Sequence, residues 1–138
     1  LKKYLGHHLP NNISLNYFYN NLEKEDFDFI SYYVLDHLKH KFVGSLNQTL
    51  LKNFTVDLKV LFQDREGTYT RFESGSWGTE VDYDPFWIFD GKLSYIRKKL
   101  ELYISVNNIF DLDYVDIGNV EQPGRWTKFG ISYQLNFD

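Results

Sequence analysis

The sequence predicts an all-β protein whose antiparallel strands have the pattern of a transmembrane β-barrel. Three observations predict it: apolar and polar residues alternate in most segments, aromatic residues make up 19% of the chain, and short turns lie at one edge with long loops at the other. Successive side chains of a strand point to opposite faces, so each alternating segment has an apolar and a polar face. Lipid covers the apolar face in an outer-membrane barrel, whereas a second sheet covers it in a soluble sandwich.

The composition of the whole chain argues against several other classes of protein. The mean hydropathy is −0.44, and no segment approaches the roughly 18 apolar residues that a membrane-spanning helix needs. The absence of cysteine excludes disulfides and cysteine nucleophiles within this chain, and a net charge of −4 argues against a basic nucleic-acid-binding face. Because the chain begins at Leu1 with no Met and no signal-like segment, we expect a C-terminal fragment of a longer precursor.

The alternation predicts seven strands, most of them close to the about 9 to 11 residues that a tilted membrane-crossing strand needs. In order they span residues 13–20, 27–35, 42–50, 54–62, 86–95, 100–107 and 127–137. The segment 27–35 carries aromatics on both faces, so its phase is unclear. Polar residues 21–26 and 36–39 predict short connections on either side of it.

The strands over 54–62, 100–107 and 127–137 have an apolar face on every second residue. In a barrel that face meets lipid. The residues that we expect to face lipid are Phe54, Val56, Leu58, Val60, Phe62, Leu102, Ile104, Phe129, Ile131, Tyr133, Leu135 and Phe137.

The connections between the strands differ in length at the two edges. Residues 64–84 and 108–124 contain several glycines and are expected to be long loops, both at one edge. Short turns at residues 51–53 and at Arg97-Lys98 lie at the other edge. Outer-membrane barrels have this asymmetry, with short periplasmic turns and longer extracellular loops.

The two short turns also predict a register. The first pairs Leu46 with Leu58 and Asn47 with Asp57, and the second pairs Tyr95 with Leu100. In the second hairpin, Lys92 then lies diagonal to Glu101, within reach of a long side chain. The residues expected on the polar face, toward a water-filled or plugged lumen, are Asp57, Lys59, Asp90, Lys92, Glu101 and Lys128.

Residues 102–111 (LYISVNNIFD), followed by Asp113-Tyr114, Gly118-Asn119 and residues 122–126 (QPGRW), resemble the C-terminal end of TonB-dependent outer-membrane receptors. In that family an NNLFD-x-x-Y element lies at the top of the penultimate strand, and a PGR element opens the last one. Ile109 stands here where Leu is usual, and one residue follows the terminal aromatic. Residues 33–42, with Gln63-Asp64-Arg65, resemble the cobalamin and iron-complex branch of these receptors.

The resemblance implies a 22-stranded barrel closed around an N-terminal plug, of which residues 1–138 would be the last seven or so strands. The first of them would run downward from the outside. The plug and the earlier strands are absent from this chain. The family imports a scarce ligand (siderophore, haem, cobalamin or oligosaccharide) with energy from the TonB complex, so we expect a transporter and not an enzyme.

The same resemblance implies the location and the partners. We expect the outer membrane of a Gram-negative cell, with its lipid around the barrel and the TonB complex acting through the absent plug. The small-molecule ligand is a further partner, and a surface lipoprotein is a candidate one. No cofactor and no nucleic acid is expected.

Loops on a rigid scaffold carry binding, so the aromatic residues of the first long loop are the candidate ligand contacts. The histidines beside residues 36–39 join them if the ligand is haem or a metal chelate. The full set is Tyr69, Phe72, Trp77, Tyr83, His37 and His40.

Other interpretations stay open. Asp111, Asp113 and Asp116 form an oxygen-rich cluster suited to calcium, although the turn glycine and bidentate Glu of a full calcium loop are missing. Carboxylates near Trp77 are the residue type of a glycosidase or lectin site. The main alternative function is a soluble β-sandwich that binds carbohydrate, and a third is an outer-membrane barrel without active import.

Overall fold

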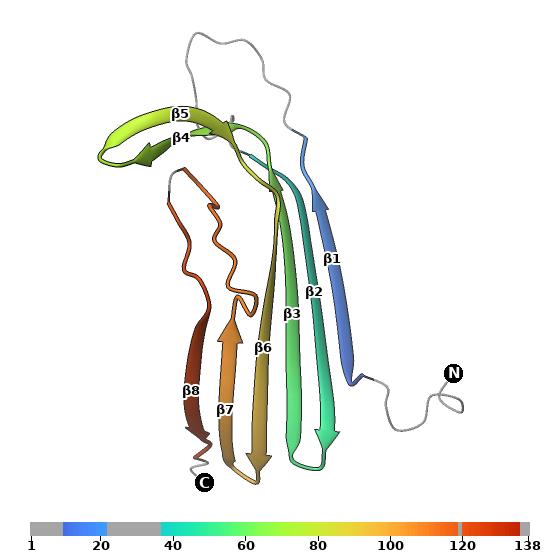
Figure 1. The fold of residues 1–138 in the computed structure, drawn as a ribbon. Coiled ribbons are helices and arrows are strands. Elements are labelled where there is room, and N and C mark those ends of the chain that lie inside the picture. Colours follow the sequence, from blue (N-terminus) through green and yellow to red (C-terminus); the bar gives the residue numbers. More distant parts are fainter. Residues whose placement is uncertain (1–9, 22–36, 119, 136–138) are drawn as a thin grey trace.

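The computed structural model describes residues 10–21, 37–118 and 120–135. These residues confirm the predicted all-β, antiparallel fold: they contain strands and turns and no helix. Within these ranges, no helix has the length and apolarity needed to cross a membrane. Six long strands lie side by side in one sheet, and a two-stranded hairpin bends away at one end (Figure 1).

The order of strands in the large sheet is β1-β2-β3-β6-β7-β8, so every connection joins neighbours. The bounds in this sheet are β1 (Asn12–Tyr19), β2 (Leu38–Leu51), β3 (Phe54–Arg65), β6 (Phe86–Arg97), β7 (Leu100–Asn107) and β8 (Trp126–Tyr133). The hairpin consists of β4 (Thr68–Glu73) and β5 (Ser76–Asp82).

Six of the seven predicted strands are present, and the segment 27–35 lies outside the described residues. The predicted connection over 36–39 is wrong, because β2 already begins at Leu38, which pairs with Arg65. The predicted direction of the first strand is also wrong. β1 is the antiparallel neighbour of β2, so in this six-stranded sheet it runs opposite to β8. β8 runs from the long-loop edge to the turn edge, and β1 therefore runs toward the long-loop edge, not away from it (Figure 1).

The predicted loop over 64–84 is wrong in its central part, which forms the β4–β5 hairpin. Its turn holds Ser74 and Gly75 with φ of 52° and 82°. Positive φ at both central residues matches the twist of a two-residue hairpin turn. The second predicted loop, 108–124, has only the isolated bridge between Val115 and Glu121 in its described part.

The predicted register of the β2–β3 hairpin is confirmed, with Leu46 opposite Leu58 and Asn47 opposite Asp57. The predicted register of β6 and β7 is wrong by two residues: Tyr95 pairs with Leu102. The turn lies at residues 98–99, one position later than expected. A shift of two residues leaves every side chain on its original face, so the predicted faces are kept.

The register gives the large sheet one apolar face that continues across all six strands. Large side chains on this face remain exposed, 44% for Leu58 and 80% for Phe129. Ile109 and Phe110 reach it from the loop after β7, where Phe110 packs edge-on against Phe89 at 5.1 Å. The residues on this face include Ile13, Leu15, Tyr17, Phe42, Leu46, Phe54, Val56, Leu58, Val60, Phe62, Trp87, Phe89, Leu93, Tyr95, Leu100, Leu102, Ile104, Val106, Phe129, Ile131 and Tyr133.

Aromatic rings form a row at each end of the apolar face, with mostly aliphatic residues between them. Near the turns, the rings of Phe54 and Tyr95 lie 5.0 Å apart. Near the long connections, Trp87 lies 4.7 Å from Phe62 and 6.2 Å from Phe42. The rows are eight residues apart along β3, which is about 26 Å at about 3.3 Å per residue.

The buried residues gather at the other face of the sheet, near the start of β6. Phe86 and Ile88 are buried there, together with Tyr83 just before the strand. The ring of Tyr114 packs on Phe86 at 4.5 Å, so the loop after β7 covers this part of the sheet. This small core fixes the position of the long connections at one edge.

Candidate ligand pocket and polar face

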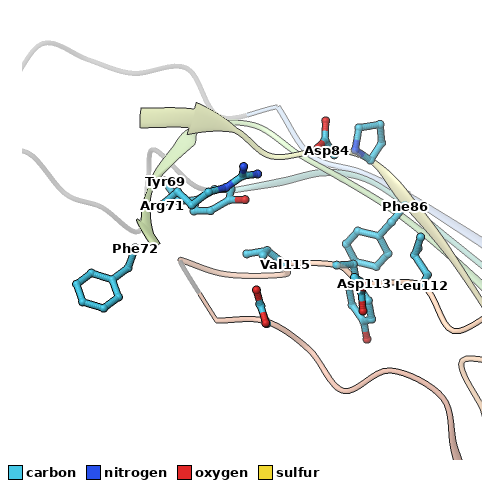
Figure 2. Close-up of a pocket in the computed structure, with 11 residues that line it drawn as sticks. Tyr69, Arg71, Phe72, Asp84, Phe86, Leu112, Asp113 and Val115 are labelled. Carbon is cyan, nitrogen blue, oxygen red and sulfur yellow. The ribbon is translucent and has the colours of Figure 1, made fainter. Parts of the chain in front are cut away.

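A pocket of about 760 Å³ lies between the β4–β5 hairpin and the loop that follows β7 (Figure 2). The hairpin side and the loop side face each other across it, and the start of β6 forms its base. The lining residues are Tyr69, Arg71, Phe72, Asp84, Pro85, Phe86, Leu112, Asp113, Tyr114, Val115 and Glu121.

Tyr83 joins the hairpin to the loop. Its ring packs against Tyr69 at 5.0 Å, and its hydroxyl accepts a hydrogen bond of 2.8 Å from the Gly118 N–H. The Arg65 guanidinium lies 5.9 Å from the same ring. Since Tyr83 is 6% exposed, it supports the pocket wall from behind and does not line the pocket.

Asn108 anchors the first turn of the loop. It is 4% exposed and has a φ of 50°, a conformation that Asn tolerates better than most residues. Its side chain donates to the Leu112 carbonyl at 2.8 Å and accepts from the Leu112 N–H at 3.0 Å. Its own N–H donates to Asp90 Oδ1 at 3.0 Å, which attaches the turn to β6.

Asp111 closes the other end of the loop against the start of β8. Its Oδ1 accepts a hydrogen bond of 2.6 Å from the Arg125 N–H, and the Arg125 guanidinium lies 3.7 Å from Oδ2. A Cβ on Gly124 would lie 2.8 Å from the same Oδ1, so this position has no room for a side chain. The motif residues of the resemblance therefore bracket the loop.

Asp116 attaches the middle of the loop to β3. Its Oδ1 accepts from Gln63 Nε2 at 2.9 Å and from Arg65 Nη2 at 3.0 Å. Asp111 and Asp116 are thus held by arginines at different places. Within residues 10–21, 37–118 and 120–135, no three His, Cys, Asp or Glu residues gather as metal ligands would.

The pocket combines aromatic rings with an excess of carboxylates. Asp84, Asp113 and Glu121 face a single cation, Arg71. Burial raises the pKa of the Tyr114 hydroxyl above its ordinary value, and the negative charge of Asp116 adds to this effect. The hydroxyl is therefore neutral at physiological pH and available as a hydrogen-bond donor. Such a lining can stack on flat apolar surfaces and accept hydrogen bonds from hydroxyl groups.

The predicted ligand contacts separate into two groups. Tyr69 and Phe72 line the pocket, and Trp77 packs edge-on against Phe72 at 5.1 Å with 70% of its surface exposed. His40 instead hydrogen-bonds Tyr17 Oη at 2.7 Å on the apolar face. His37 Nε2 lies 4.0 Å from Glu66 Oε2, and neither histidine is in the pocket lining.

The polar face carries all six charged residues that the sequence placed on it: Asp57, Lys59, Asp90, Lys92, Glu101 and Lys128. In the register of β3 and β6, Asp57 lies opposite Lys92 and Lys59 lies opposite Asp90. Most of them line a shallow groove of about 400 Å³.

Lys92 makes the central ion pair of this face. Its Nζ lies 2.7 Å from Glu101 Oε1, which also accepts from Ser94 Oγ at 3.0 Å. The contact forms although the predicted register was wrong, because the lysine extends over the Tyr103 ring at 4.4 Å. The same Tyr103 ring lies directly over Gly130 of β8, where a Cβ would clash with it.

The loop side of the pocket was not predicted from the sequence. Leu112, Tyr114 and Val115 lie in a segment that the motif marked only as a loop, and no pattern paired it with the hairpin. The contact depends on Tyr83 and Asp116, whose partners are 35 and 51 to 53 residues away.

Neither comparison with known proteins adds a relative: no protein-family model matches the sequence, and no curated protein matches it.

Proposed function

We propose that this chain is part of the wall of an outer-membrane β-barrel, in a ligand-importing receptor of the TonB-dependent kind. The uncovered apolar face carries the proposal. It is mostly aliphatic in the middle and bounded by an aromatic row at each end. Membrane barrels have an apolar band about 25 Å tall flanked by aromatic girdles, and their strands tilt by about 35–45°. At that tilt the two rows, about 26 Å apart along β3, would lie about 19–21 Å apart across the bilayer, somewhat less than the height of the band.

The connections support the same proposal. The long β3–β6 and β7–β8 connections lie at one edge, and the two-residue turns at 52–53 and 98–99 lie at the other (Figure 1). This division matches long extracellular loops and short periplasmic turns. A soluble β-sandwich would need a second sheet over the apolar face, and none of the described segments supplies one.

In this proposal the two sides of the molecule have different tasks. The pocket at the long-loop edge captures the ligand, and the polar face lines the path beside the plug. The alternating charges keep that face hydrated or bound to the plug, with Lys92 and Glu101 joined in an ion pair. TonB acting on the plug then opens the path.

The pocket lining favours one class of ligand among those open from the sequence. Three carboxylates around one arginine repel polyanions such as haem propionates or anionic ferric chelates. Aromatic rings stack on the apolar faces of sugars, and carboxylates accept hydrogen bonds from their hydroxyl groups. An uncharged oligosaccharide is therefore the ligand that we expect.

A binding screen followed by uptake tests the proposal. The full-length receptor in detergent is titrated with haem, cobalamin, ferrichrome and mixed malto- and xylo-oligosaccharides, and binding is read by a shift in thermal unfolding. We expect a shift with an oligosaccharide. Phe72→Ala should weaken its binding up to about tenfold, the value of one ring contact, whereas Phe110→Ala, outside the pocket, should not.

Whole-cell uptake of the bound sugar then separates the alternatives. Active import stops when a protonophore removes the proton gradient. Uptake that continues would identify a passive channel instead. A protein that stays in the aqueous fraction without detergent would favour the soluble carbohydrate-binding sandwich.

A further inference from the structure

The turn edge of the large sheet carries basic residues without acidic neighbours. Lys52 lies in the β2–β3 turn, and Arg97, Lys98 and Lys99 lie at the β6–β7 turn; all four are exposed. We call these four residues the basic collar. In the described residues at this edge, 10–13, 48–54, 95–100 and 131–135, the sequence contains no Asp or Glu.

The two basic turns form one continuous rim. The Ile96 N–H donates a hydrogen bond of 2.8 Å to the Asn53 carbonyl, which joins the ends of both hairpins. The Gln134 N–H donates to the Lys99 carbonyl at 2.9 Å and adds the end of β8 to the rim. The four cations therefore lie along one edge and are not scattered over the surface.

The basic collar lies directly beyond the aromatic row near the turns, which we call the lower aromatic row. Arg97 is on the apolar face, two residues past Tyr95, whose ring packs on Phe54. Long cationic side chains just outside an aromatic row place their stems along apolar surface and their charges at headgroup level. The nearest carboxylate along the chain, Glu101, is on the polar face and is held by Lys92.

The opposite edge has the reverse charge. Residues 37–41, 64–85 and 108–125 contain ten Asp or Glu against three Arg and two Lys. Anionic headgroups are therefore attracted to the turn edge and repelled from the long-loop edge. The separation of charge along the strands is a property of the whole sheet and does not depend on the ligand pocket.

We propose that the basic collar binds the phosphate headgroups of anionic phospholipids in the leaflet at the turn edge. This inference rests on the proposed function, because it needs the apolar face in a bilayer. Clusters of four or more Lys or Arg beside a membrane-crossing segment attract anionic lipid. The chemistry recognised is the negatively charged phosphodiester of a lipid headgroup at the membrane surface, where the aromatic row holds the collar in place.

The test measures which lipids surround the protein. The full-length receptor is placed in nanodiscs of phosphatidylcholine with one-fifth phosphatidylglycerol, and the lipids retained after delipidation are quantified by mass spectrometry. We expect phosphatidylglycerol enrichment of at least about threefold, since each cation near the surface contributes to the attraction. Lys98→Gln/Lys99→Gln should remove most of it.

A matched double variant is the control. Lys39→Gln/Lys41→Gln removes the same charge at the start of β2, next to the long-loop edge, and should keep the enrichment. No enrichment in the unmodified protein would overturn the proposal, as would equal loss in both variants or none in the collar variant. Loss of enrichment on adding inorganic phosphate would indicate a site for the free anion, which also contradicts it.

The outcomes also separate this proposal from the proposed function. A receptor that inserts into the nanodisc without lipid preference contradicts the collar alone. A protein that does not enter the bilayer contradicts the proposed function, and the collar proposal is overturned with it.

Discussion

The two faces of the large sheet are built from the same six strands, yet they differ in what they need from their surroundings. On the polar face, charged residues have partners within the sheet: Lys92 pairs with Glu101, and Asp57 accepts a hydrogen bond from Asn47. On the apolar face, side chains such as Leu15 and Ile131 are 68% and 71% exposed. An exposed apolar surface that continues over a whole sheet needs a partner or a membrane.

Alternation of apolar and polar residues along each strand is enough to give one sheet a face suited to water and a face suited to an apolar environment. The polar face is satisfied in water, whereas the apolar face is stable only against lipid or protein. Its aromatic rows favour lipid, because a protein partner would not require rings at both ends. Substitutions that exchange the character of one face therefore test the account.

The largest effect is expected from a charge in the middle of the apolar face. Leu58 is midway between the aromatic rows, opposite Leu46 and Gly91. Leu58→Arg should lower the free energy of unfolding of the whole protein in a bilayer by about 2–4 kcal/mol, the cost of Arg near the midplane. Urea titration in lipid vesicles, followed by tryptophan fluorescence, measures it.

The control for this variant is Ser45→Arg. Ser45 is exposed on the polar face at the same height, opposite Lys59. The new cation is hydrated there, and its repulsion from the lysine should cost less than about 1 kcal/mol. An equal loss of unfolding free energy in the two variants would mean that both faces of the sheet have the same surroundings.

A smaller effect is expected where the loop folds over the polar face. Asn108→Ala leaves the N–H and the carbonyl of Leu112 without their side-chain partner and should cost about 2–3 kcal/mol. Asn108→Gly removes the same hydrogen bonds but relaxes the positive φ, so it should cost less than the alanine variant. Equilibrium unfolding of both variants checks this order, and a more stable alanine variant would contradict the strained turn.

The smallest effect is expected from a charge at the end of the apolar face. The alternation alone would treat Ile131 like any lipid-facing residue, but its row contains Leu102, Tyr95 and Phe54, at the level of the lower aromatic row. Ile131→Arg should cost about 0–1 kcal/mol, because a cation near the interface reaches water. A loss as large as that of Leu58→Arg would place the membrane lower on the sheet.

Much of the large sheet could be predicted from the sequence because alternation fixes the face of each residue. The β2–β3 register followed from the short turn predicted at residues 51–53, although β2 continues to Leu51, which pairs with Phe54 after a register shift. The β6–β7 register did not, because the basic run at residues 97–99 allows turns that differ by two residues, and that shift changes no face. Alternation cannot distinguish such registers.

The candidate site was predictable only in part. Tyr69 and Phe72 were found as loop aromatics, although the Ser74-Gly75 pair between β-branched and aromatic residues was a hairpin signal. The contact of His40 with Tyr19 could not be predicted, because the two rings pack at a tilt with their centroids 5.1 Å apart and Tyr19 lies 21 positions earlier in the chain. Long-range contacts of this kind leave no local pattern.

Nitroxide accessibility along β3 tests the central claim most directly. These 138 residues contain no cysteine, so single cysteine substitutions from 54 to 62, made in the whole protein after any cysteine elsewhere has been replaced, give nine labelled variants in a bilayer. Collision with oxygen, which dissolves in lipid, should peak at the even positions with a maximum at residue 58, and collision with a water-soluble nickel complex should be low there. Even positions that the nickel complex reaches, or that neither reagent reaches, would show that water or protein covers the apolar face and would contradict the account.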